Sequence, residues 1–118
     1  MPDRSASGLD IQTETRGEAT VIRLSGQMRE MGADALREEL DRLLEDGRYK
    51  LVFDIGGVSF ISSVGLGQIM RAYRAATKND GYVRIVNPQP LVEEVFRFTK
   101  LNTLIEMFPS VAEAVNKT

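Results

Sequence analysis

The sequence predicts a single α/β domain built on a mixed, largely parallel sheet, and three observations support this. The chain has 118 residues, of which 42% are hydrophobic, which is enough for one ordinary core. Two alternating segments near the start are joined by a tight connection, and after them apolar runs alternate with stretches of helical spacing. We therefore expect the order β-β-α-β-α-β-α-β-α over residues 9–118, with right-handed crossovers, after a disordered lead-in at residues 1–8.

The first two strands are expected to form a β-hairpin. Leu9–Glu14 and Ala19–Leu24 both alternate apolar and polar residues, and Gly17 between them can adopt the positive φ of a tight turn. From Ala33 the apolar period changes to i, i+4, i+7 and i+8, which predicts an amphipathic helix that ends near Gly47.

The middle of the chain contains the most strongly apolar strand. Lys50–Ile55 is an almost continuous apolar run, as expected for a central strand that is covered on both faces. We expect residues 56–64 to be a connection that leads into a helix, with Leu66 on its apolar stripe and its end near Gly81. Three apolar residues in this connection are expected to be partly buried: Val58, Phe60 and Ile61.

The last part of the chain repeats the alternation of strand and helix. Tyr82–Val86 is predicted to be a strand, and the helix after it is expected to begin at Pro90. Thr103–Phe108 is predicted to be the last strand. Ser110 and Glu113 have the spacing of a capping box, which predicts a C-terminal helix.

Composition excludes several classes of function. The chain has no histidine and no cysteine, so it cannot assemble a Ser-His-Asp or Cys-His nucleophile, a disulfide or a thiolate metal site. The net charge is −2 and the basic residues are scattered, which disfavours nucleic acid as a partner. No apolar stretch approaches the roughly 20 residues of a membrane span. We predict a cytoplasmic protein that is not an enzyme, uses no cofactor or metal and binds other proteins.

Two adjacent serines mark the junction between the central strand and the next helix. The first amides of a helix are unpaired and carry partial positive charge, so Ser62 or Ser63 could simply cap the helix. Gly65 and Gly67 go beyond what a cap requires, because they would let another molecule approach the helix closely. The glycine pattern lacks the third glycine of a dinucleotide fingerprint and the Gly-Lys-Ser/Thr of a P-loop, so a nucleotide site is disfavoured.

The segment around these serines resembles the signature of STAS domains, in particular the bacterial anti-sigma-factor antagonists. It reads DIGGVSFISSVGLGQIM, in which a strand, two serines, a glycine-leucine-glycine and a helix follow one another. The similarity covers nearly the whole chain, since VIRLSGQM resembles the second strand and turn of the family and FPSVAEAV resembles its closing helix.

The resemblance implies a phosphorylation switch. In that family a serine kinase of the histidine-kinase-like ATPase fold, which is also the anti-sigma factor, phosphorylates the serine of the motif, and a serine phosphatase resets it. The unphosphorylated antagonist binds the kinase and releases the sigma factor. The alignment of the glycines places the acceptor at Ser63, with Ser62 a less favoured acceptor. The implied partner-binding residues are Gln27, Met28, Arg29, Ser62, Ser63, Val64, Gly65, Leu66 and Gly67.

The chain departs from the family pattern at two acidic positions. Ser62 replaces the aspartate before the phosphoserine, and Gln27-Met28-Arg29 replaces a more acidic turn. The loss of two carboxylates leaves open an alternative function, a STAS docking subunit of an ABC-type transport or signalling assembly that is not phosphorylated. A small-ligand sensor is a weaker third reading.

Overall fold

The computed structural model describes residues 7–117. Most of the predicted lead-in, residues 1–6, lies outside the described residues, as does residue 118. Ser7 and Gly8 are described and lead into the first strand, and the Gln27 amide donates a hydrogen bond to the Gly8 carbonyl at 2.9 Å.

A five-stranded mixed sheet forms the centre of the molecule, in the order β1-β2-β3-β4-β5. The first two strands pair antiparallel, whereas β2 to β5 pair parallel. The strands are β1 (Leu9–Arg16), β2 (Ala19–Met28), β3 (Lys50–Ile61), β4 (Tyr82–Val86) and β5 (Glu106–Phe108). The predicted hairpin, element order and mixed sheet are therefore confirmed.

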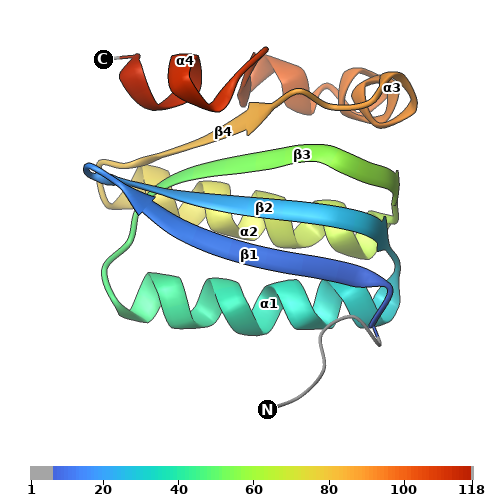
Figure 1. The fold of residues 1–118 in the computed structure, drawn as a ribbon, viewed down its shortest axis with the longest axis horizontal. Coiled ribbons are helices and arrows are strands. Elements are labelled where there is room, and N and C mark those ends of the chain that lie inside the picture. The colour runs from blue at the N-terminus through green and yellow to red at the C-terminus, as the bar shows by residue number, and fades with distance from the viewer. Residues whose placement is uncertain (1–6, 118) are drawn as a thin grey trace.

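Helices cover both faces of the sheet, and Figure 1 shows α1 and α4 on opposite sides of it. One large core cluster joins the apolar sides of α1, α2 and α3 to β3 and β4, whereas α4 packs in a smaller cluster on the other face. The helices are α1 (Glu30–Glu45), α2 (Ser63–Lys78), α3 (Pro90–Phe98) and α4 (Val111–Asn116), with a 3₁₀ turn at Leu101–Thr103. No helix in residues 7–117 is long and apolar enough to cross a membrane.

Strand β3 is longer than predicted, because the expected connection at residues 56–64 continues as strand as far as Ile61. The pair Gly56-Gly57 indicates a turn in the sequence, but here it accommodates a close approach between strands. A Cβ on Gly57 would lie 2.7 Å from Ser25 Cβ on β2, and the pairing of the two strands shifts register just before this point. Because of this extension, β3 ends at the edge of the sheet where α2 begins.

Other boundaries differ less from the prediction. Helix α1 begins three residues before Ala33, and the predicted strand at Thr103–Phe108 is reduced to its last three residues, because the chain before it forms the 3₁₀ turn. Gly17 has the expected positive φ, at +60°. The Ser110 side chain accepts a hydrogen bond from the Glu113 amide at 3.2 Å, so the predicted cap of α4 is present.

Candidate functional site

The two serines lie at the edge of the sheet where the parallel strands β2 and β3 both end, which we call the carboxyl edge. Met28 pairs with Ile61 at the ends of these strands, and the Ser62 amide donates to the Met28 carbonyl at 2.9 Å. The next residues, Arg29 and Ser62, are the N-caps of α1 and α2. Because the strands are parallel, both helices begin at this edge, and their partly positive N-termini lie there together.

Ser62 caps α2. Its backbone is extended, with φ −84° and ψ 168°, and its hydroxyl accepts a hydrogen bond from the Gly65 amide at 3.2 Å. This is the geometry of an N-cap residue, whose side chain satisfies one of the unpaired amides of the first turn. Ser62 is half-buried. The structural need for a hydroxyl at this helix start is thus met by the first serine.

Ser63 is the first helical residue and is exposed. Within residues 7–117 its hydroxyl makes no hydrogen bond, so the fold does not use it. A charge attached to this oxygen would lie beside unpaired amides at the positive end of the helix dipole. The first turn of α2 contains no acidic residue to repel such a charge. The two adjacent serines therefore have different roles, since one caps the helix and the other faces solvent.

Two predicted partner-binding residues lie beneath the surface. Met28 is fully buried, with 0% of its surface exposed, and Gly65 packs directly on it. A Cβ on Gly65 would lie 2.4 Å from Met28 Sδ and 3.2 Å from Ile61 Cγ1, so the absence of a side chain is explained by packing within the chain. The expectation that Gly65 is open to another molecule is wrong, and Met28 supports the site from below without offering a side-chain surface.

The remaining glycine and leucine of the motif also differ from each other. Gly67 is exposed, and a Cβ there would meet no atom within 4 Å, so its surroundings are open as predicted. Leu66 is half-buried and packs against the main core cluster.

Arg29 is held in place beside the serines by two side chains. Its guanidinium carbon lies 4.4 Å from the centroid of the Phe60 ring, and its Nε donates to Gln27 Oε1 at 2.9 Å. Gln27 and Phe60 are register partners on β2 and β3, which explains how residues 33 positions apart meet. Within the described residues Arg29 takes part in no ion pair, so its charge is not neutralised by a carboxylate.

The sequence did not identify Phe60 as part of this surface. It was expected to be partly buried together with Val58 and Ile61, but those two are buried whereas 38% of the Phe60 surface is exposed. The alternation of a strand through residue 61 would have placed it on the face opposite Ile61.

Three exposed apolar side chains lie on the segments that meet at the carboxyl edge, namely the end of β3 and the first turns of α1 and α2. Met31 in the first turn of α1 is 64% exposed, and Val64 directly after the serine is 45% exposed. We call Met31, Phe60 and Val64 the apolar rim. Apolar side chains grouped around an exposed polar group are typical of surfaces that become buried on binding another protein. Residues 7–117 contain no group of three or more acidic, histidine or cysteine side chains that could hold a metal ion.

The fold and the site together define a one-domain α/β protein that presents a serine at the start of the helix after its central strand. The chain belongs to the STAS domain family, whose model matches residues 10–114.

Curated relatives of the chain are regulators. An anti-sigma F factor antagonist from Lysinibacillus sphaericus is 27% identical over 85 residues, which are 71% of this chain and 73% of that protein. An anti-sigma-B factor antagonist from Staphylococcus aureus is 24% identical over 99 residues, which are 84% of this chain and 92% of that protein.

Solved structures share the fold. An anti-sigma factor antagonist from Mycobacterium paratuberculosis superposes with a TM-score of 0.83 at 24% identity, covering 92% of each chain. The anti-sigma factor antagonist SpoIIAA, in its unphosphorylated form, superposes with a TM-score of 0.80 at 24% identity, covering 91% of this chain and 94% of its own. The phosphorylated form of SpoIIAA from Bacillus superposes with a TM-score of 0.74, covering 91% of this chain and 97% of its own, at the same identity.

Proposed function

We propose that this protein is an anti-sigma factor antagonist that is switched by phosphorylation of Ser63. Its unphosphorylated form binds an anti-sigma factor that is a serine kinase of the histidine-kinase-like ATPase fold, and so releases a sigma factor. A serine phosphatase restores the binding form. The observation that carries the proposal is that Ser63 is exposed at the start of α2 and that its hydroxyl makes no hydrogen bond within the described residues.

The relatives support this assignment. Curated proteins that match the chain are antagonists of anti-sigma factors, and SpoIIAA, which has the same fold, has been solved both unphosphorylated and phosphorylated. The apolar rim around Ser63 provides contact area for a protein partner, and that area would be buried together with the serine.

Phosphorylation would oppose binding through charge. A phosphate adds about −1.5 to −2 charges and three strong acceptor oxygens, which the first amides of α2 can receive without refolding. Burying that charge in the interface would remove most of its hydration, and the backbone amides of α2 carry no full charge to compensate for it. A loss of only about 3 kcal/mol would weaken the complex more than about a hundredfold.

The proposal is tested by incubating the chain with the cognate kinase, ATP and Mg²⁺ and measuring intact mass. We expect an increase of one phosphate, which Ser63→Ala abolishes and Ser62→Ala retains. An unchanged mass with an active kinase would contradict the proposal. A phosphate that survives Ser63→Ala and is lost in Ser62→Ala would instead assign the acceptor to the capping serine.

A second candidate function is a docking subunit of an ABC-type transport assembly or a signalling assembly that uses the same surface without phosphorylation. It is favoured by the loss of the two acidic positions of the family pattern, where this chain has Ser62 and the turn Gln27-Met28-Arg29. Copurification separates the two candidates. Retention of a soluble kinase supports the switch, whereas retention of a transporter ATPase, with Ser63 unmodified, supports docking.

A further inference from the structure

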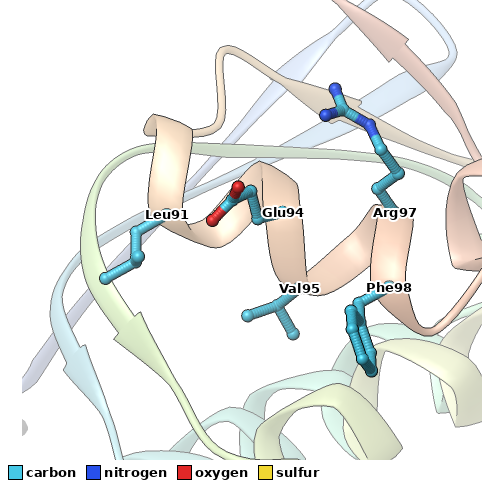
Figure 2. Close-up of a pocket in the computed structure, with 5 residues that line it drawn as sticks. All are labelled: Leu91, Glu94, Val95, Arg97 and Phe98. Atoms are coloured by element: carbon cyan, nitrogen blue, oxygen red, sulfur yellow. The ribbon is translucent and has the colours of Figure 1, made fainter.

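Helix α3 carries an apolar stripe that its own fold covers only in part, because Val95 packs against the main core cluster whereas Leu91 and Phe98 are exposed. Leu91 is 65% exposed and Phe98 is 91% exposed, and Val95 between them is half-buried. Spacings of four and three residues place these side chains on one side of the helix, and Figure 2 shows them projecting together. We call Leu91, Val95 and Phe98 the α3 stripe. The five residues that line the hollow of about 650 Å³ beside it are Leu91, Glu94, Val95, Arg97 and Phe98.

The core-facing side of α3 is separate from this stripe. Val92 and Phe96 are 1% and 0% exposed and belong to the main core cluster. The helix is therefore anchored by Val92 and Phe96 and presents Leu91 and Phe98 to solvent. An exposed phenylalanine on a well-anchored helix is characteristic of a surface that another molecule covers.

Charged residues flank the stripe on one side only. At 100° per residue, Glu94 and Arg97 both fall on the same side of the line through Leu91 and Phe98. Within residues 7–117 Glu94 makes no ion pair, and Arg97 makes an exposed one to Glu93 at 3.4 Å. The flank thus carries an acidic residue and, three positions later, a basic one.

We propose that the α3 stripe binds the α3 stripe of a second copy of this chain, with the two helices antiparallel. A two-fold axis between the helices places Leu91 of each copy opposite Phe98 of the other copy. The same axis leaves the charged flanks of both copies on the same side of the helix pair. Glu94 of each copy then faces Arg97 of the other copy. Arg97 forms this pair by giving up its contact with Glu93 of its own chain. The charged flank is therefore complementary to itself in this arrangement.

The size of the surface sets the strength of this dimer. The contact involves one nine-residue helix from each copy, far fewer residues than the roughly 20–30 per partner of a standard interface. Contacts of this size are weak and transient, so we expect reversible association with a dissociation constant of about 10–500 µM. The net charge of −2 per copy opposes such an approach only slightly.

Sedimentation of the purified full chain, at concentrations up to about 1 mM, tests the proposal without any other partner. We expect a monomer–dimer equilibrium. Phe98→Ser should raise the dissociation constant at least about a hundredfold, because each dimer contains the substituted side chain twice. Met31→Ser, which removes a similarly exposed side chain elsewhere, should leave the constant unchanged. A chain that stays monomeric throughout, or equal effects of the two variants, would overturn the proposal.

The antiparallel arrangement has its own test, because the chain contains no cysteine. An equimolar mixture of Leu91→Cys and Phe98→Cys chains should oxidise mainly to the mixed disulfide. Predominance of the two homodimeric disulfides would indicate parallel helices and contradict this geometry.

For the charged flank, Glu94→Arg alone should weaken the dimer about tenfold, and adding Arg97→Glu should restore it. Failure of the double variant to recover would show that the flank does not face its counterpart.

None of these tests depends on the proposed function. Dimerisation is measured on the chain alone, whereas the switch is measured with the kinase. Loss of one result therefore leaves the other standing.

Discussion

The two ends of the sheet are built differently. At the carboxyl edge, where Ser63 lies, the apolar rim is exposed and the Arg29 guanidinium stacks on an aromatic ring. At the opposite edge, where the parallel strands begin and which we call the amino edge, charged side chains pair with one another. The exposed ion pairs there include Lys50–Glu18 at 2.6 Å, Lys117–Glu106 at 2.5 Å and Arg48–Asp46 at 3.0 Å.

The hollow at the amino edge also has a charged lining. The amino edge has a hollow of about 510 Å³ whose lining includes Arg16, Glu18, Lys50, Arg84 and Lys117. Burying these charges against a partner would require removal of their hydration, which offsets much of any attraction. Burying the apolar rim costs no such desolvation. The comparison indicates which end of the molecule is suited to contact with another protein, and the predictions below test it.

The largest expected effect is on binding at the carboxyl edge. Val64→Asp should weaken binding to the kinase at least about a hundredfold, because an unpaired carboxylate would be buried in the interface. The variant should fold normally, since aspartate is favourable in the first turn of a helix. Binding is measured by calorimetry. Lys117→Ser at the amino edge is the control, and equal losses in both variants would mean that the partner does not distinguish the two ends.

The next effect concerns the packing beneath the site. Gly65→Ala should lower the free energy of unfolding by about 1–3 kcal/mol, because the new methyl group would collide with the buried Met28 side chain. Gly67→Ala, two positions further along the same helix, has open space around it and should raise stability by up to about 1 kcal/mol. Denaturant unfolding of both variants measures the difference. Changes of the same sign in the two variants would contradict the packing described for Met28.

The division of roles between the serines predicts a smaller difference. Ser62→Ala should cost about 1 kcal/mol of stability through loss of the N-cap. Ser63→Ala should change stability by less than about 0.5 kcal/mol, because its hydroxyl is exposed. Thermal unfolding of the two variants, recorded at one pH and salt concentration, makes the comparison. A greater loss for Ser63→Ala would mean that the second serine also supports the helix.

The smallest effect is at the amino edge. A hydrogen bond from Lys50, together with its charge, lowers the pKa of Glu18, and the same contact raises the pKa of Lys50. The stabilisation from the lowered carboxyl pKa is present above the unfolded-state pKa of Glu18 and is lost as pH falls through the folded-state value. That from Lys50 is lost as pH rises through its raised pKa. An NMR titration of Glu18 should move toward the ordinary range in Lys50→Gln, and an unmoved midpoint would mean that the pair is not formed in solution.

Most of the fold follows from local patterns that the sequence displays directly. Helical spacing and strand runs predicted the order of these helices and strands, because the apolar stripe of each helix packs in one of the two core clusters. The end of β3 could not be predicted in the same way. Gly56-Gly57 normally ends a strand, and only the approach of Ser25 from β2, which is distant in sequence, explains why a strand requires glycine there.

The site shows the same contrast between local and distant contacts. The position of the serines at a helix start follows from sequence, and the structure confirms that α2 begins at Ser63. The burial of Met28 and the exposure of Phe60 depend on the register between β2 and β3, which includes two irregularities. A shift of one residue reverses which side chains face the core, so a single strand pattern could not assign these two residues.

The contact between Met28 and Gly65 also gives the molecule an internal reporter. The chain has only five methionines, so isotopic labelling of their terminal methyl groups would give a sparse spectrum in which each signal can be assigned by substitution. The Met28 sulfur lies against the first turn of the helix that bears Ser63, with no exposed surface of its own. Its chemical shift should respond to a tilt of that turn and not to molecules that merely touch the outside, so it can separate a change of shape from a change of charge.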